Sequence, residues 1–396
     1  MTNAAGGPPQ DSGHEQLLTV PVTTMAHGGH AVGRVDGQVV FVRHAIPGET
    51  VTARVTGQGR KGRYLTADAV EVLTASSDRV PPPCPVAAEC GGCDFQHISL
   101  SRQRELKATV LSEQLQRLGG VEMAVPVLAA DDSGTGWRTR MRFVADDDGR
   151  WGLRRHGSHA VVPLQHCVIA TENVNAALAD APAGIPGSEL VVVDQPDGAV
   201  TQLVPGGDPV SVVAQAGGRR WQVAATGFWQ THRAAAQTLV AAVGPHVAGA
   251  DSWWDLYCGV GLFAGSLAAD GQNVTGVEGD RRAARLARRN LRDLPNVRIE
   301  AADVGPWVAA HGSSRSATDQ PDVIVLDPPR RGAGRAVVTG LTQTTATKLV
   351  YVACDPAALG RDVGYLREDG WTVAVVTGFD LFPMTHHVEA VAVLSR

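Results

Sequence analysis

The C-terminal part of the chain alternates short apolar runs with longer amphipathic segments. Apolar runs of strand length end at Leu256, Val277, Leu326 and Ala353, and a last one covers residues 388–394. The segments between them have the spacing of helices with one buried face. Strands that alternate with helices in this way predict an α/β fold with a largely parallel sheet. We therefore expect a doubly wound domain at residues 229–396.

The N-terminal part has the shorter period of β structure. Val51, Ala53 and Val55 alternate with polar residues, and Asp36-Gly37 is typical of a tight hairpin turn. Several short strands at this spacing predict a small OB-type β-barrel. The predicted organisation is a disordered tail (residues 1–16), the barrel (17–76), a central mainly-β domain (77–228) that contains a helix at 100–118, and the doubly wound domain (229–396).

Composition narrows the class of protein. The net charge of −5 gives the 396-residue chain no overall basic character, so any nucleic-acid surface has to be local. Residues 1–16 lack the apolar core of a signal peptide, and no run of about 18 apolar residues would span a membrane. These features predict a cytoplasmic protein with no membrane partner. Six cysteines in such a protein favour metal binding or catalysis over disulfides.

The best candidate nucleic-acid surface is one arginine-rich strand. Arg138, Arg140 and Arg142 share one face of a predicted strand, which suits an RNA backbone. The alternative is a strand face whose charge is balanced by the aspartates at 146–148. The segment Arg281–Arg292 has helical spacing and is dense in arginine, and a solvated helix face is the default interpretation there.

Gly259 and Gly261 form a turn between the first strand of the C-terminal domain and the next helix. Because they lack a Cβ, both positions let a ligand lie against the backbone. Glu278 ends the following strand, where doubly wound sheets bind the ribose hydroxyls of a cofactor. The combination favours an adenosine-type cofactor, whereas the glycines alone also fit a purely structural turn.

Three strands of the predicted sheet end in reactive groups, namely Glu278, Asp327 and Cys354. The crevice at the carboxyl ends of such strands is the usual binding site, so these side chains should meet there. A thiolate in this crevice can add to carbon 6 of a pyrimidine and make carbon 5 reactive toward a methyl donor. A base must then remove the proton from carbon 5. The alternative for Cys354 is a buried structural thiol.

Three cysteines lie close together before the first long helix. Cys84, Cys90 and Cys93 have the spacing C-x5-C-x2-C, and Cys167 is the best candidate for a fourth ligand. Thiolates without histidine suit an iron–sulfur cluster or an all-cysteine zinc site. One distant cysteine beside a group of three favours iron modestly, and scattered structural thiols are the remaining alternative.

Four motifs together resemble the RNA uracil-5-methyltransferase family over nearly the whole chain. They are Asp255–Phe263, Asp327–Arg330, Tyr351–Pro356 and Phe382–Glu389. The resemblance implies a TRAM domain as the N-terminal barrel, a central iron–sulfur domain and a Rossmann-like methyltransferase domain. It also implies S-adenosylmethionine as the cofactor and RNA as the substrate. The chain departs from the family at Asp355, where asparagine is common, and a carboxylate beside the thiol would raise the pKa of Cys354 unless it points away.

The resemblance also assigns roles to residues. Cys354 is implied as the nucleophile and Glu389 as the base that removes the proton. Besides the glycine turn at Gly259 and Gly261, the positions that match cofactor contacts are Gln230, Tyr257, Glu278, Asp303 and Asp327. The positions that match the four ligands of a [4Fe-4S] cluster are Cys84, Cys90, Cys93 and Cys167.

The identity of the RNA is less constrained. Family members with both the TRAM domain and the cluster cysteines act more often on 23S ribosomal RNA, which we therefore expect, and a transfer RNA T-loop uridine is the alternative. We expect a monomer. A protein that binds or assembles RNA without turnover is a second class, which the intact Cys354 and Glu389 disfavour. A radical enzyme is a third, but the C-x3-C-x2-C spacing of such enzymes is absent.

Overall fold

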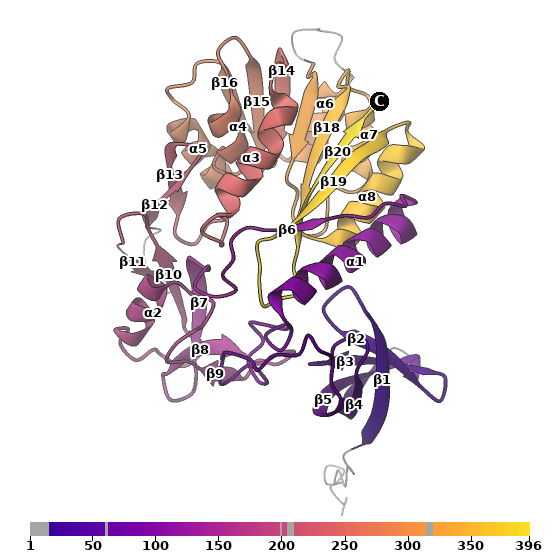
Figure 1. The fold of residues 1–396 in the computed structure, drawn as a ribbon. Helices are drawn as coiled ribbons and strands as arrows, with labels where there is room; N and C mark the ends of the chain where they lie inside the picture. Colours follow the sequence, from indigo (N-terminus) through magenta and orange to yellow (C-terminus); the bar gives the residue numbers. More distant parts are fainter. Residues whose placement is uncertain (1–15, 60–61, 199, 204–209, 314–319) are drawn as a thin grey trace, which may run out of the picture. The chain divides into compact units, whose positions relative to one another are not determined.

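The structure is a computed structural model of the chain and describes residues 16–59, 62–198, 200–203, 210–313 and 320–396. The predicted disordered tail lies outside the described residues except for Gln16. The chain divides into two compact units, Met1–Arg79 and Val80–Arg396 (Figure 1). The finer boundaries predicted at residues 76 and 228 stay predictions. Among the described residues, no helix is both long and apolar enough to cross a membrane.

The N-terminal unit contains a closed five-stranded barrel in the order β1-β2-β3-β5-β4, which confirms the predicted barrel. Its strands are β1 (Leu17–Met25), β2 (Ala31–Val35), β3 (Gln38–Arg43), β4 (Thr50–Gln58) and β5 (Tyr64–Thr74). Alternate residues such as Val20, Val40 and Val51 are fully buried inside it. Asp36 and Gly37 have φ values of 49° and 80° and form the tight hairpin turn between β2 and β3.

A five-stranded antiparallel sheet with the order β11-β10-β7-β8-β9, together with the hairpin β12-β13, forms one part of the C-terminal unit. These strands are β7 (Arg140–Ala145), β8 (Trp151–Arg154), β9 (Val161–Pro163), β10 (Glu189–Asp194), β11 (Val200–Leu203), β12 (Ser211–Ala216) and β13 (Arg219–Ala224). Phe143 and Leu190 of this sheet pack with helix α2 (Glu172–Ala179) and with Cys93 and Cys167 in one apolar core.

The other part is an eight-stranded sheet with the order β16-β15-β14-β17-β18-β20-β19-β6. Its strands are β6 (Val127–Ala129), β14 (Ser252–Leu256), β15 (Asn273–Glu278), β16 (Val297–Ala301), β17 (Val323–Leu326), β18 (Lys348–Ala353), β19 (Thr372–Asp380) and β20 (Glu389–Ser395). Its helices are α1 (Leu100–Gly119), α3 (Ala235–Val247), α4 (Leu262–Leu267), α5 (Arg281–Asn290), α6 (Val304–His311), α7 (Arg335–Thr342) and α8 (Pro356–Glu368). Both faces of the sheet are covered by helices. The neighbouring residues Trp253 and Trp254 therefore pack into two different apolar cores, one on each face.

Two elements that precede the antiparallel sheet in sequence complete this eight-stranded sheet. Strand β6 pairs in parallel with β19, and helix α1 packs along α8 (Figure 1). The helices approach closely at Gly360, where a Cβ would lie 2.5 Å from the carbonyl oxygen of Gln114. The C-terminal sheet therefore contains chain from residues that the sequence pattern places in the central domain.

The direction of strand β20 brings catalytic candidates together. Strands β14, β15, β17 and β18 are parallel neighbours, whereas β20 runs antiparallel to β18, with Ala390 opposite Ala353. The first residue of β20, Glu389, therefore lies at the edge where the parallel strands end. Cys354 directly follows the last residue of β18 at the same edge.

Candidate active site

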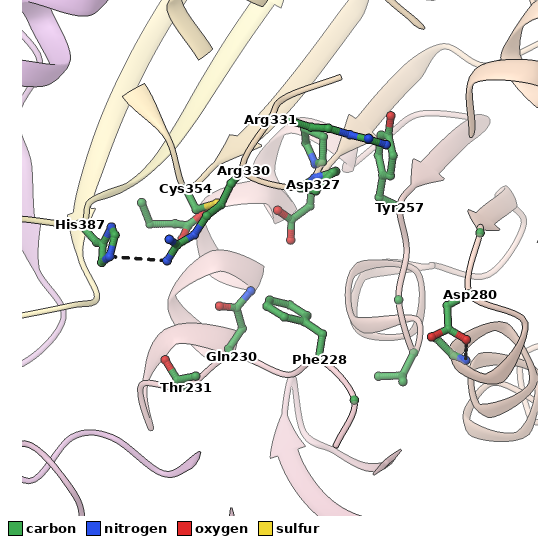
Figure 2. Close-up of a pocket in the computed structure, with 18 of the residues that line it drawn as sticks. Phe228, Gln230, Thr231, Tyr257, Asp280, Asp327, Arg330, Arg331, Cys354 and His387 are labelled. Carbon is green, nitrogen blue, oxygen red and sulfur yellow. Dashed lines mark hydrogen bonds between the residues drawn. The ribbon is translucent and has the colours of Figure 1, made fainter. Parts of the chain in front are cut away.

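One cavity of about 1440 Å³ opens at this edge of the sheet. It is lined by all the predicted catalytic and cofactor residues except Gly261, namely Gln230, Tyr257, Gly259, Glu278, Asp303, Asp327, Cys354 and Glu389. Figure 2 shows Cys354, Asp327 and Tyr257 along one side of it and Gln230 on the other. The structure thus brings the predicted thiol, the predicted base and the predicted cofactor residues to one space.

The thiol of Cys354 is partly exposed in this cavity. Burial, followed by the charges of Glu389 and Asp327, raises the pKa of the Cys354 thiol to about 12. Asp355 raises the pKa of Cys354 less than Glu389 or Asp327 does. Its side chain instead caps helix α8 and accepts a hydrogen bond from the Ala358 amide at 2.8 Å. The departure from the family at Asp355 is therefore accommodated by a helix cap.

Glu389 and Asp327 are two buried carboxyl groups in the same cavity. Glu389 is 3% exposed, and burial together with the charge of Asp327 raises its pKa well above the ordinary value. Burial raises the pKa of Asp327 as well. Two carboxyl groups that interact in this way resist being charged together. A carboxyl with a raised pKa is well matched to accepting a proton near neutral pH.

Arg330 supplies positive charge beside these acids. Its guanidinium lowers the pKa of both Cys354 and Glu389, against the effect of burial. Its Nη2 lies 3.5 Å from Nε2 of His387 (Figure 2). Burial, then the neighbouring His386 and Arg330, lowers the pKa of His387 to about 3, so this ring is neutral and can accept the guanidinium hydrogen.

The glycine turn and Glu278 form the other end of the cavity. Tyr257 and Gly259 have φ values of 64° and 57°, which turn the chain sharply after β14. The Glu278 carboxylate accepts hydrogen bonds from the amides of Gly259 at 2.9 Å and Asp280 at 2.7 Å. A Cβ built on Gly259 would meet no atom within 4 Å, so this position is open to a ligand, as expected.

Gly261 differs from the expectation. It does not line the cavity, and a Cβ there would lie 2.8 Å from Cδ1 of Leu291. Its φ of 94° also lies in the left-handed region that favours glycine. Contact with Leu291 and the left-handed turn explain why residue 261 is glycine. The purely structural interpretation therefore applies to Gly261, and only Gly259 leaves room for a ligand beside the backbone.

Sequence reasoning missed two residues of the cavity. Arg330 entered only as the end of the Asp327–Arg330 motif, although an arginine that follows two prolines at a strand end is a recognisable sign of a fixed cation. Phe228 is 74% exposed and lies in the cavity beside Gln230 (Figure 2). An exposed aromatic ring that lines a cavity is suited to stacking on a nucleic-acid base.

The arginine face predicted on residues 138–142 is not a free basic surface. Arg140 donates from Nη2 to the carbonyls of Ala224, Ala225 and Gly227. Arg142 forms an ion pair with Glu189, and Nε of Arg138 donates to the carbonyl of Arg140. The aspartates at 146 and 148 pair with Arg150 instead. These arginines therefore have partners within the chain, and the role of this strand as an RNA-backbone surface stays a prediction, with Arg138 among the residues that line the cavity.

The four predicted cluster cysteines lie in one buried neighbourhood without disulfides. Burial, then Cys167 and Cys90, raises the pKa of the Cys93 thiol to about 12, and the amide of Gly92 donates to Sγ of Cys90 at 3.4 Å. Among the described residues, however, no group of three or more His, Cys, Asp or Glu side chains is arranged to hold a metal ion. The structure therefore gathers the thiols without forming a site for a single ion.

Comparison with known proteins gives two family matches and full-length relatives. A TRAM domain family matches residues 13–70, and the tRNA (Uracil-5-)-methyltransferase family matches residues 221–396. An "Uncharacterized RNA methyltransferase" of Streptomyces avermitilis is 44% identical, with 95% of this chain and 97% of the relative covered. The 23S rRNA (uracil(1939)-C(5))-methyltransferase of Halomonas elongata is 32% identical, with 98% and 91% covered.

A solved structure has the same fold. The tRNA (uracil-54, C5)-methyltransferase of Pyrococcus abyssi, in complex with S-adenosyl-L-homocysteine, matches with a TM-score of 0.70 over 95% of this chain and 99% of that chain. Its sequence is 22% identical, so this likeness concerns the fold alone. The relatives above 30% identity extend over nearly the full chain and carry the assignment. On these grounds, the chain belongs to the RNA uracil-5-methyltransferase family.

Proposed function

We propose that this protein transfers a methyl group from S-adenosylmethionine to carbon 5 of a uridine in RNA. The observation that carries the proposal is the shared cavity of Cys354, Glu389 and the turn at Gly259. A nucleophile, a base and a cofactor cradle have to reach one pyrimidine ring at the same time, and this arrangement permits it. Family membership supports the same reaction class.

The proposed reaction proceeds through covalent catalysis by Cys354. Its thiolate sulfur bonds to carbon 6 of the uracil, and the ring electrons move to the carbonyl oxygen at carbon 4 as an enolate. S-adenosylmethionine, when bound, supplies an electrophilic methyl group, which carbon 5 takes up. Glu389 removes the remaining proton from carbon 5, and the electron pair that is left expels the sulfur from carbon 6. Arg330 favours the charged forms of both side chains.

The ribose of the cofactor would be held at the end of the cavity away from Cys354. Glu278 presents a carboxylate that suits ribose hydroxyls, and Gly259 leaves room for the ligand beside the backbone. Gln230, Tyr257, Asp303 and Asp327 line the same cavity and are the remaining proposed contacts. The target base must leave its stack to reach Cys354, which costs a few kcal/mol of unstacking free energy.

The proposed substrate is 23S ribosomal RNA. The Halomonas elongata relative, which aligns over nearly the whole chain, is named for that activity. The second candidate is transfer RNA, which the name of the matching family and that of the Pyrococcus abyssi protein favour. The two candidates share the chemistry and differ in the RNA that fits the protein.

Methyl transfer to RNA from a strain lacking the gene tests the function. We expect labelled methyl groups from S-adenosylmethionine to appear as 5-methyluridine at a defined position of 23S ribosomal RNA. Cys354→Ala should abolish the incorporation. Incorporation into transfer RNA alone would select the second candidate. Binding of RNA with no incorporation into either would instead favour a protein that binds or assembles RNA without turnover.

The four buried cysteines are proposed ligands of a [4Fe-4S] cluster. A cluster of four irons holds its thiolates farther apart than a single ion does, which is compatible with four neighbouring thiols that form no single-ion site. Its proposed role is structural, as a clamp on this part of the chain. Iron and sulfide analysis of anaerobically purified protein tests the proposal, and stoichiometric zinc without iron would refute it. The monomeric state and the cytoplasmic location stay predictions.

A further inference from the structure

Helix α5 carries a dense row of arginines. The segment 281–292 contains six arginines and no acidic residue, in a chain whose net charge is −5. Five of them lie within α5, and at about 100° per residue these five positions span roughly 120° of the helix surface. Ala284, Ala287 and Leu291 lie on the opposite side and are buried. The arginines are Arg281, Arg282, Arg285, Arg288, Arg289 and Arg292.

The exposed members of this row lack acidic partners. Within the part of the chain that the structure describes, Arg281, Arg285 and Arg289 form no salt bridge with a carboxylate. Arg288 is different, because its Nε and Nη2 donate to the carbonyl of Ile299 at 3.0 and 2.8 Å. Three arginines on other elements do have carboxylate partners, which are Glu105 for Arg102, Asp146 for Arg150 and Glu368 for Arg335.

This arrangement destabilises the isolated helix. Like charges four positions apart repel, as at Arg281 and Arg285 and again at Arg285 and Arg289. Arginines in the first turn also oppose the positive end of the helix dipole. Asp280 counters them at the start of the helix, since its side chain accepts hydrogen bonds from the amides of Arg282 and Ala283 at 2.7 and 3.3 Å. A bound polyanion would remove the repulsion.

The row begins at the active-site cavity. Asp280, Arg282, Ala283 and Leu286 line the cavity, and Figure 2 shows Asp280 at the end away from Cys354. Helix α5, Arg281–Asn290, extends about 14 Å at 1.5 Å per residue, which is long enough to meet several backbone phosphates. An RNA strand whose target base is at Cys354 can therefore cross the rim of the cavity at its cofactor end and continue along α5.

We propose that the exposed arginines of α5 bind the sugar–phosphate backbone of the RNA beside its target nucleotide. This rests on the proposed function only in taking RNA as the substrate. The contacts position the RNA and carry no base specificity, because they reach phosphates alone. Helix α5 thereby provides a second basic surface besides the one that the sequence pattern predicts for the strand at residues 138–142.

The salt dependence of RNA binding tests the proposal. The test variant is Arg281→Gln/Arg285→Gln/Arg289→Gln, in the full-length protein and with a labelled 20-nucleotide oligouridine as the probe. Glutamine keeps a comparable helix propensity and removes only the charge. The matched control is Arg102→Gln/Arg150→Gln/Arg335→Gln, which removes three charges that have acidic partners. Circular dichroism verifies that both variants are folded.

We expect the slope of log affinity against log salt to be shallower by about 2 in the α5 variant, since each lost phosphate contact in a single strand contributes about 0.7. Affinity at 0.1 M salt should fall tenfold or more, while the control changes less than twofold. Equal slopes for the α5 variant and the unaltered protein would overturn the proposal, as would failure of the unaltered protein to bind the probe. Failure of the proposed function is distinguishable, because it appears as absent methyl transfer by the unaltered protein.

Discussion

The side chain of Gln103 holds the backbone of Met384. Its Oε1 accepts a hydrogen bond from the Met384 amide at 2.8 Å, and its Nε2 donates to the carbonyls of Phe95 and Ile98 at 3.0 and 2.9 Å. The Met384 carbonyl accepts in turn from the amides of Asp94 and Phe95. A fully buried residue of α1 therefore joins the cysteine-rich segment to the loop that leads into Glu389.

A second contact reinforces this connection. The carboxylate of Asp94, which directly follows Cys93, lies 2.7 Å from Nδ1 of His386. Met384 has a φ of 67°, a conformation that a residue without glycine's freedom adopts only when its surroundings hold it. The order of the cysteine-rich segment and the position of the proposed base, Glu389, are therefore physically linked.

Gln103→Leu should reduce turnover much more than cofactor binding. The substitution leaves the buried Met384 amide without its partner, and a shift of about 1 Å in a reacting group can cost about 100-fold in rate. We expect kcat to fall by about that factor, with unchanged affinity for S-adenosylhomocysteine measured by calorimetry. Gln114→Leu, which alters another buried glutamine of α1, is the control. Equal losses of kcat in the two variants would argue against the link.

Methyl transfer should accelerate as the pH rises. The reactive form of Cys354 is the thiolate, and its pKa is raised to about 12, so the thiolate fraction increases about tenfold per pH unit near neutrality. The raised pKa of Glu389 acts in the same direction, because the base must be ionised. Single-turnover rates between pH 6.5 and 9 measure this. A rate that is flat or declining over that range is incompatible with the proposed charge states.

Arg330→Met should displace that pH profile toward higher pH. The guanidinium lowers the pKa of Cys354 and Glu389, so its loss makes both reactive forms scarcer at a given pH. We expect the rate at pH 7.5 to fall at least about tenfold and to recover partly at pH 9. Arg331→Met, at another arginine lining the cavity, should leave the position of the profile unchanged. A uniform loss across pH would mean that Arg330 acts by binding RNA instead.

Lys107→Met should destabilise the fold strongly. Nζ of Lys107 lies 2.6 Å from Oδ1 of Asp380, and the two side chains are 1% and 2% exposed. Removing the lysine leaves a buried carboxylate unpaired, which costs about 3–5 kcal/mol in the free energy of unfolding. Urea unfolding should show this loss, and Lys107→Met/Asp380→Asn should regain a large part of it. If the double variant is no more stable than the single one, the ion pair is not the cause.

The sequence pattern predicts much of the C-terminal site because parallel strands bring their ends to one edge. Glu278, Asp327 and Cys354 each follow or end such a strand, so their meeting in one cavity was expected. Glu389 begins a strand, and only the antiparallel direction of β20 explains its position at the same edge. The family motif indicated Glu389, whereas strand periodicity alone gives no direction.

Long-range contacts limit the rest. The pairing of β6 with β19 joins segments about 250 positions apart, and no local pattern in Val127–Ala129 indicates it. Arg140 has the spacing of an exposed strand residue, yet three carbonyls from the stretch 224–227 take up its guanidinium. Conversely, the arginines of α5 match a solvated face in sequence, and only the structure shows that Arg281, Arg285 and Arg289 form no salt bridge within the described residues.

Formation of a covalent protein–RNA product tests the central claim most directly. RNA containing 5-fluorouridine should be trapped on the protein in the presence of S-adenosylmethionine, because the fluorine at carbon 5 cannot be removed as a proton. We predict a methyl-labelled product that survives denaturation, forms with Cys258→Ala and is absent with Cys354→Ala. A trapped product of equal yield from Cys354→Ala would contradict the account, since the sulfur that attacks the ring would then belong to another residue.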